Sequence, residues 1–389
     1  MTPQSISLPL LALFEDHISA DYRDLSEWSC VYVQHILHSN RACVEFLARR
    51  GIVQGEINIF GKGYSTSHES ADALRADGYK LWEPDELYSY DAPFDDQIIG
   101  AVADTLELLS MRRRKLLLID EGGIGIRALA SSGAEFDVLS AVELTSRGAQ
   151  YYPLISDTVP IVDVARSDLK KVEEAPHIAR SMVAHVLGGG RRRAKIPHDA
   201  KFGLIGAGAI GQYLVSYLAE QGIPVAWHDH RIPGSTFPSS QALIDNCDVI
   251  LSSTGEGIGL AGKVSEIRGA KIFGNCGSSD VEFQLHVLKR YTLDTAGCCF
   301  HVEIPARPWA GEVRFTSPTA DLTFLNGGFP VNFDGTPDPI SPRYIQLTRA
   351  GLMAGAVQAS CSSRPGVHAL RADWQRFLVA EFQHLSQFS

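Results

Sequence analysis

The stretch GLIGAGAIGQYL, residues 203–214, decides the fold of this 389-residue chain. Three glycines, Gly206, Gly208 and Gly211, follow the apolar run FGLI and open a segment whose apolar residues recur at helical spacing as far as Gly222. The first glycine permits a tight turn, the second lets the backbone approach a pyrophosphate, and the third lets the helix pack closely on the strand. The pattern therefore predicts the strand, turn and helix that begin a dinucleotide-binding unit.

The residues that follow fit the same unit. A second apolar run, IPVAWHD, ends at Asp229, about 20 residues beyond the glycines, where an acid is expected to bind the ribose of the adenosine half. An acid there favours NAD over NADP, because a 2′-phosphate would face a carboxylate. The neighbouring Arg231 leaves NADP open. We expect NAD as the cofactor.

Later strands of this series end in small polar turns, SSTG (252–255) and NCG (275–277). Ligands in open α/β sheets bind at the carboxyl ends of parallel strands, so both turns are candidate cofactor contacts, although they could also be simple turns. The cofactor-binding residues that these motifs predict are Gly206, Gly208, Ala209, Ile210, Gly211, Asp229, Ser253, Thr254, Gly255, Asn275 and Gly277.

Composition narrows the class of protein. The chain is 45% hydrophobic and 21% charged, and its net charge of −10 argues against a nucleic-acid partner. No apolar run approaches the ~20 residues of a membrane helix, so we expect no membrane partner. The seven cysteines are sparse and lack the spacing of disulfide frameworks or metal sites, which predicts a cytoplasmic protein without a bound metal.

Apolar runs also organise the part of the chain before the glycine turn. EINIF (56–60), KLLLID (115–120) and FDVLSAVELTS (136–146) are typical of parallel strands that are buried on both faces. A second α/β series runs from 201 to about 335, and helical patterns return afterwards. We predict an α/β fold with two Rossmann-like domains. A discontinuous substrate domain would cover 1–185 and 338–389, and an inserted NAD-binding domain 186–337.

Five motifs, in this order, resemble the S-adenosylhomocysteine hydrolase family: NIF (58–60), DEGG (120–123), ELTSRG (143–148), GNCGSSDVEF (274–283) and LNGGFPVNFDG (325–335). The resemblance implies a tightly held NAD that transiently oxidises a ribose hydroxyl before an elimination step. It also implies cofactor contacts from Asn332, Thr145 and Ser146. Because that family forms dimers and tetramers, we expect a homodimer.

The half of the chain that would bind the substrate departs from the family pattern. Glu121 stands where the family has a catalytic aspartate, Leu144 replaces a glutamate, and Ser278 replaces a histidine. Each acid–base group typically contributes ~10²–10⁴ in rate. We therefore expect a divergent relative that does not hydrolyse S-adenosylhomocysteine.

Four residues remain as candidate catalytic groups: His35, Asp120, Glu121 and Lys171. His35, near a strand end, is a candidate general base or a structural histidine. Asp120 and Glu121 follow a strand and could bind a substrate hydroxyl, or could cap a helix. Of the neighbouring Lys170 and Lys171, only one could point inward, and both could be solvated.

The leading hypothesis is an NAD-dependent enzyme that oxidises, permanently or transiently, a hydroxyl-bearing small molecule in a cleft between the domains. One alternative is a catalytically silent NAD-binding regulatory protein. A second alternative is a nucleoside thioether hydrolase with rebuilt acid–base groups.

Overall fold

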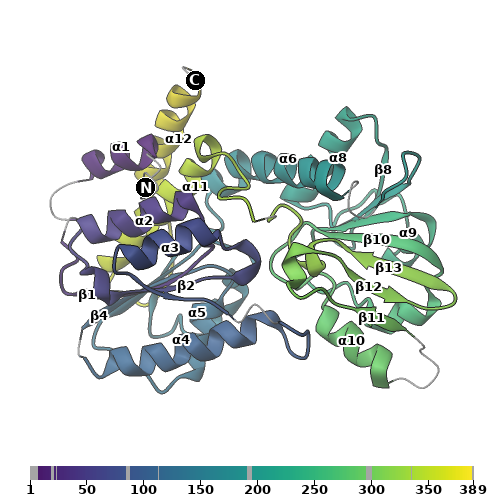
Figure 1. Cartoon of the computed structure of the whole chain (residues 1–389). Helices are drawn as coiled ribbons and strands as arrows, with labels where there is room; N and C mark the ends of the chain where they lie inside the picture. The colour runs from purple at the N-terminus through teal and green to yellow at the C-terminus, as the bar shows by residue number, and fades with distance from the viewer. Residues whose placement is uncertain are drawn as a thin grey trace. The chain divides into compact units, whose positions relative to one another are not determined.

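The computed structural model describes residues 8–18, 22, 24–84, 88–112, 114–190, 195–294, 300–333 and 335–387 (Figure 1). The chain divides into two compact units. Unit 1 consists of Met1–Pro84, Asp95–Glu174 and Thr336–Ser389, and unit 2 consists of Asp85–Phe94 and Ala175–Gly335. Each unit contains a mainly parallel sheet with helices packed on it, which confirms the predicted class of two Rossmann-like α/β domains.

Unit 1 is built on a seven-stranded sheet with the order β14-β6-β5-β4-β1-β2-β3, and its strand pairs are parallel. The chain first builds outward from β1 through β2 to β3, and then continues on the other side of β1 with β4. This reversal between β1 and β4 is the topological switch point, where open α/β sheets bind ligands. The strands are β1 (Trp28–Val33), β2 (Ile57–Phe60), β3 (Lys80–Trp82), β4 (Lys115–Asp120), β5 (Leu139–Glu143), β6 (Pro160–Asp163) and β14 (Gly366–Ala369).

Helices cover both faces of this sheet, with α2 and α11 on one face and α4 and α5 on the other (Figure 1). Helix α11 is buried along almost its whole length because it packs on β5 and β6 and is covered by α1, α2 and α12. Gly355 allows this close packing, since a Cβ atom there would lie 2.6 Å from Val164. The helices are α1 (Pro9–His17), α2 (His38–Arg49), α3 (His68–Ala76), α4 (Phe94–Ser110), α5 (Ile124–Ser131), α11 (Pro342–Ser360) and α12 (Ala372–Gln387).

Unit 2 contains a second seven-stranded sheet, with the order β11-β12-β13-β10-β9-β7-β8. Its strand pairs are parallel except near one edge, where β12 pairs antiparallel with both β11 and β13. The chain passes from β7 to β8 and then returns to the other side of β7 as β9, so the switch point lies between β7 and β9. The strands are β7 (Phe202–Ile205), β8 (Val225–His228), β9 (Val249–Ser252), β10 (Gly269–Asn275), β11 (His301–Glu303), β12 (Val313–Thr316) and β13 (Ala320–Phe324).

The core of unit 2 forms between its central strands and the helices α6 and α8. Phe202 and Leu204 of β7 pack with Leu214 and Leu218 of α8, and all four side chains are buried. No helix in the described ranges is long and apolar enough to cross a membrane. The helices of this unit are α6 (Ala175–His185), α8 (Ala209–Glu220), α9 (Ser240–Asn246) and α10 (Leu285–Asp294).

Candidate functional site

The glycine turn of unit 2 lies at its switch point, between β7 and α8. Gly206 has a φ of +93°, and a Cβ atom there would lie 2.6 Å from the carbonyl oxygen of Ser253. A Cβ atom on Gly211 would lie 2.2 Å from the carbonyl oxygen of Gly206. The protein's own packing therefore requires the first and third glycines of the motif.

Gly208 is different, because nothing in the protein requires a glycine at this position. It precedes α8 with a φ of −66° and a ψ of −164°, an extended conformation open to any residue. A Cβ atom there would have no other atom within 4 Å. The following Ala209 is exposed and Ile210 is half-buried. The missing side chain thus leaves the start of α8 open to a ligand, which fits a pyrophosphate at a helix N-terminus.

Asp229 directly follows β8 and lies beside the glycine turn. Its Oδ2 accepts a hydrogen bond from the Ala207 amide at 2.8 Å, and its Oδ1 accepts from the amides of Arg231 and Ile232. Partial burial opposes ionisation, but these three donors outweigh it and hold the pKa of Asp229 below its usual value. A fixed carboxylate at this position fits the ribose of an NAD cofactor. The guanidinium of Arg231 is engaged in an ion pair with Glu256.

Glu282 braces the turn after β9. Its buried carboxylate accepts hydrogen bonds from the Ser252 hydroxyl, from the amide and hydroxyl of Thr254, and from the Gly255 amide, at 2.5–3.1 Å. The predicted contact residues Ser253, Thr254 and Gly255 thus sit in a rigid turn beside Gly206. The sequence analysis did not identify Glu282, because its partners lie about 30 residues earlier in the chain.

The two asparagines predicted to contact the cofactor differ in how they are bonded. Asn275 donates to the carbonyl oxygens of Ser279 and Gly328 and accepts from the Gly277 amide, so its side chain braces the turn after β10. Asn332 is also buried, yet its Oδ1 accepts no hydrogen bond from any residue in the described ranges. A buried acceptor without a donor is costly, so Asn332 is the asparagine available to a ligand.

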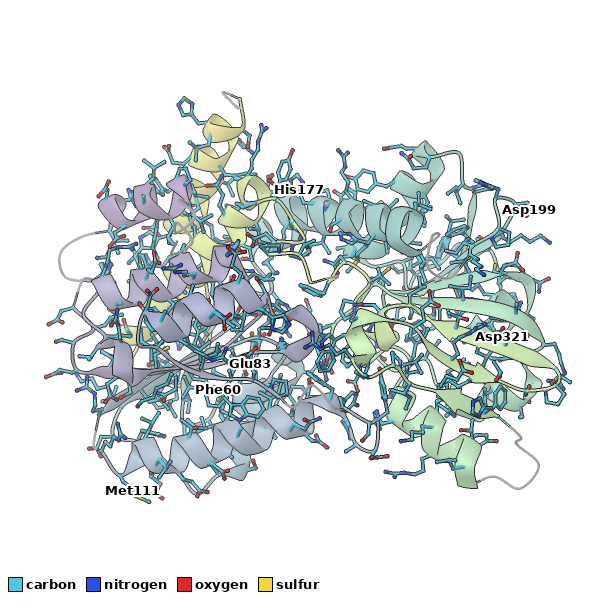
Figure 2. All side chains as sticks on the ribbon, viewed as in Figure 1. Phe60, Glu83, Met111, His177, Asp199 and Asp321 are labelled. Carbon is cyan, nitrogen blue, oxygen red and sulfur yellow. The ribbon has the colours of Figure 1, made fainter. Side chains whose placement is uncertain are left out.

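In unit 1, residues from three neighbouring strands meet at the switch point. His35 follows β1, Glu121 follows β4, and Ser65 follows β2, whose last residue Phe60 is labelled in Figure 2. The Nε2 atom of His35 lies 2.7 Å from Glu121 Oε1, and its Nδ1 lies 2.5 Å from Ser65 Oγ. We call Ser65, His35 and Glu121 the triad. The sequence analysis predicted two of its members, and the structure brings them into contact.

The protonation of the triad follows from its burial. Burial is the largest effect on His35 and lowers its pKa, so the imidazole is neutral near neutral pH. Burial also opposes ionisation of Glu121, but the imidazole of His35 and the ammonium of Lys62 outweigh it and hold its pKa far below the usual value. Glu121 is therefore a carboxylate that accepts the Nε2–H of His35.

The Ser65 hydroxyl can hydrogen-bond with His35 in either protonation state of the imidazole. With a neutral imidazole, the Ser65 hydroxyl donates to Nδ1. With an imidazolium, Nδ1–H donates to Ser65, which then donates to the carbonyl oxygen of Lys62 at 3.2 Å. In both states the two ring nitrogens of His35 and the Ser65 hydroxyl have hydrogen-bond partners, so the triad can take up or release a proton by small rotations of one hydroxyl.

Asp120 is held by the backbone of the loop that follows β4. It is completely buried, and its carboxylate accepts hydrogen bonds from the amides of Glu121, Gly125 and Ile126 at 2.8–3.0 Å. Its oxygens thus cap α5 and shape the loop that carries Glu121, and its predicted catalytic role stays a prediction. The capping alternative is the one that the geometry supports.

Glu143, at the end of β5, holds the same loop from the other side. Its carboxylate accepts hydrogen bonds from the amides of Gly122 and Gly123 and from the amide and hydroxyl of Thr145, at 2.6–3.1 Å. Burial, and then the charge of Asp120, raise the pKa of Glu143 to about 8. Glu143 is a positioning residue for the Glu121 loop.

The remaining predicted site residues of unit 1 are placed as follows. The Thr145 hydroxyl is bonded to Glu143 and accepts from the amides of Gly122 and Gly148, so the loop already uses it. Ser146 is exposed. The side chain of Lys171 lies outside the described residues, and its neighbour Lys170 forms an ion pair with Glu174. No cluster of three or more His, Cys, Asp or Glu in the described ranges could hold a metal ion.

No family model matches the chain. Two curated relatives, both named as uncharacterized proteins of Mycobacterium tuberculosis (strains CDC 1551/Oshkosh and ATCC 25618/H37Rv), are 30% identical over 348 residues. The match covers 87% of this chain, and the chain spans 65% of the length of these relatives.

Similar solved structures include NAD-bound 3-phosphoglycerate dehydrogenase of Entamoeba histolytica, at 12% identity and a TM-score of 0.40, covering 85% of this chain and 94% of that one. They also include the NAD complex of a D-isomer-specific 2-hydroxyacid dehydrogenase of Lactobacillus delbrueckii ssp. bulgaricus, at 12% identity and a TM-score of 0.34, covering 85% and 96%. Backbone similarity at this level assigns no reaction.

The expected assignment to the S-adenosylhomocysteine hydrolase superfamily is wrong. The similar solved structures are a phosphoglycerate dehydrogenase and a 2-hydroxyacid dehydrogenase, and no family model matches. The structure supplies the physical reason. Asp120 and Glu143 of the resembling motifs bond to loop amides, and Asn275 and Glu282 do the same in unit 2. These four residues of the shared motifs therefore shape the turns that carry them.

Proposed function

We propose that this chain is an NAD-dependent oxidoreductase that acts on a hydroxyl group of a small molecule. The observation that carries the proposal is Gly208, which stands directly before α8 in a dinucleotide-binding motif and leaves open space at the helix start, where a pyrophosphate would approach the backbone. The triad of unit 1 supports it, because a dehydrogenase needs a group that accepts the proton of the hydroxyl.

The residues of unit 2 suit NAD in three places. The open turn at Gly208 and the start of α8 would bind the pyrophosphate, and Asp229 would bind the adenosine ribose. The unbonded Oδ1 of Asn332 would accept a hydrogen bond from the cofactor's carboxamide. When bound, NAD supplies the hydride acceptor that oxidation of a carbinol carbon needs.

The triad would move the proton. Ser65 would receive the proton of the substrate hydroxyl while passing its own to Nδ1 of His35. The Glu121 carboxylate would stabilise the resulting imidazolium through Nε2–H. Such proton transfer typically contributes ~10²–10⁴ in rate.

Substitution of Gly208 tests the cofactor site directly. Gly208→Ala should weaken NAD binding at least about tenfold in a calorimetric titration, because the new methyl group occupies the approach of the phosphates. Thermal stability should change little, since the methyl group meets no protein atom. Gly100→Ala, on α4 of unit 1 and equally unobstructed, is the matched control and should leave NAD affinity unchanged. Equal affinity of the Gly208 variant and wild type would contradict the proposed site.

The alternative is a regulatory protein that binds NAD without using it. The contacts of His35 with Glu121 and Ser65 favour an enzyme over that alternative. Formation of NADH on adding hydroxyl compounds to the NAD-loaded protein decides between them. A homodimer and a cytoplasmic location stay predictions.

A further inference from the structure

Arg349 is a buried arginine without a carboxylate partner in the described part of the chain. It lies on α11 within unit 1 and is 3% exposed. Its Nε donates to Ser39 Oγ at 3.4 Å, and no Asp or Glu of the described ranges forms an ion pair with it. A buried guanidinium without an anion costs several kcal/mol. Such a charge is expected to bind an anion from outside the chain.

Among the atoms of the Arg349 guanidinium, only Nε has a hydrogen-bond partner in the described part of the chain. Asp338 accepts a hydrogen bond from the Ser39 amide at 3.1 Å; the charge of Arg349 acts on it, but the two side chains form no ion pair. Burial is the main effect that raises the pKa of Asp338 above its usual value. The two Nη groups of Arg349 form no hydrogen bond with any residue that the structure describes. They remain available to a planar oxyanion.

A second buried cation lies beside the triad. Lys62 is 2% exposed, and its Nζ donates to the carbonyl oxygen of Glu121 at 2.9 Å. The positive charges of Lys62 and Arg349 both act on His35 and Glu121, and in each case they favour the neutral imidazole and the ionised carboxyl. Arg349 also connects to the triad through α2, because its Nε donates to Ser39 Oγ and the next residue, Asn40, donates from Nδ2 to the carbonyl oxygen of His35 at 2.6 Å.

We propose that Arg349 and Lys62 form a binding site for a carboxylate of the substrate next to the triad, so that the molecule oxidised is a small hydroxy acid. The guanidinium fork matches a carboxylate with two parallel hydrogen bonds. An uncharged alcohol would leave the buried cation unpaired, which makes Arg349 a specificity determinant. That the substrate carries a hydroxyl group rests on the proposed function, whereas that it carries a carboxylate rests on Arg349.

Binding titrations and thermal unfolding of the full chain without NAD test the site. The probes are glycolate, acetate, ethylene glycol and inorganic phosphate. Glycolate and acetate should bind the wild type and raise its Tm, and ethylene glycol should do neither. Arg349→Met should weaken glycolate binding at least about tenfold, because it removes the charged fork. It should leave the Tm of the unliganded protein unchanged or raised, because it removes an unpaired buried charge.

Arg41 offers a matched control. It is also a buried arginine of unit 1, but it forms ion pairs with Glu45 at 3.0 Å and with Asp77 at 2.7 Å. Arg41→Met should lower the Tm and keep glycolate affinity. Arg349→Lys keeps the charge without the fork, and it should bind glycolate about tenfold more weakly than wild type even if the Met variant does not fold.

Glycolate affinity that is unchanged in both Arg349 variants would overturn the proposal. So would a loss of Tm in Arg349→Met as large as that in Arg41→Met, which would indicate a structural arginine. Binding of phosphate alone among the anions would overturn the carboxylate assignment. Since these titrations contain no NAD, failure of the redox function leaves their outcome intact, and their failure leaves NAD binding intact.

Discussion

His35 is the residue whose titration reports the state of the triad. Burial lowers its pKa below the ordinary value of a histidine side chain, about 6.5, and the Glu121 carboxylate opposes this shift. An NMR titration should therefore place the midpoint of His35 below the ordinary histidine value. The His35 signal is identified because it is missing from the spectrum of His35→Gln. Glu121→Gln removes the opposing charge and should lower the midpoint further.

The control for this titration is Asp72→Asn, which removes an exposed carboxylate on α3 and should leave the midpoint of His35 unchanged. A His35 midpoint above 6.5, or one that rises in Glu121→Gln, would contradict the assigned charges. A midpoint well above 7 would make the imidazole a cation at neutral pH, which cannot accept a proton, and a rise in Glu121→Gln would show that Glu121 does not act on His35 as a carboxylate.

At the scale of elements, the sequence predicted strands well and their end loops only in part. The runs at 56–60 and 115–120 correspond to β2 and β4, and the run at 136–146 contains β5. Apolar runs identify buried strands because burial on both faces leaves no other choice of residue. The loop after β4 depends on Glu143, a residue of the next strand, and pairing between loops leaves no periodic pattern in a sequence.

The two carboxylates that hold this loop should give the protein a pH-dependent stability. The folded state keeps a proton on Glu143 up to a pKa of about 8, whereas the unfolded chain releases it near 4.5. The folded state binds more protons in this window, so the free energy of unfolding should fall as pH rises through it, by at most about 1.4 kcal/mol per pH unit for one proton. Asp120→Asn removes the neighbouring charge, lowers the pKa of Glu143 and should flatten the slope.

Urea denaturation at a series of pH values measures these slopes. Asp72→Asn, whose carboxylate is exposed on α3, is the control and should keep the wild-type slope. An unchanged slope in Asp120→Asn would show that the Asp120 charge does not raise the pKa of Glu143.

At the scale of the whole molecule, each unit has its own apolar core and its own switch point. The glycine motif predicted the site of unit 2 because its residues are close in sequence. The site of unit 1 was predicted only in part, at His35 and Glu121. Ser65 and Lys62 lie in the polar turn directly after EINIF, so a signal for them was present. Arg349 lies more than 200 residues later, and only the packing of α11 brings it into unit 1.

We propose that unit 2 binds NAD and that the triad of unit 1 accepts the substrate proton. The most direct test is NADH formation in a single turnover, with NAD-loaded protein and a panel of small hydroxy acids and alcohols. A hydroxy acid should yield NADH stoichiometrically with wild type. His35→Gln should slow the step by ~10²–10⁴ while keeping its affinity for NAD. Absence of NADH with every compound despite bound NAD, or an undiminished rate in His35→Gln, would contradict the claim.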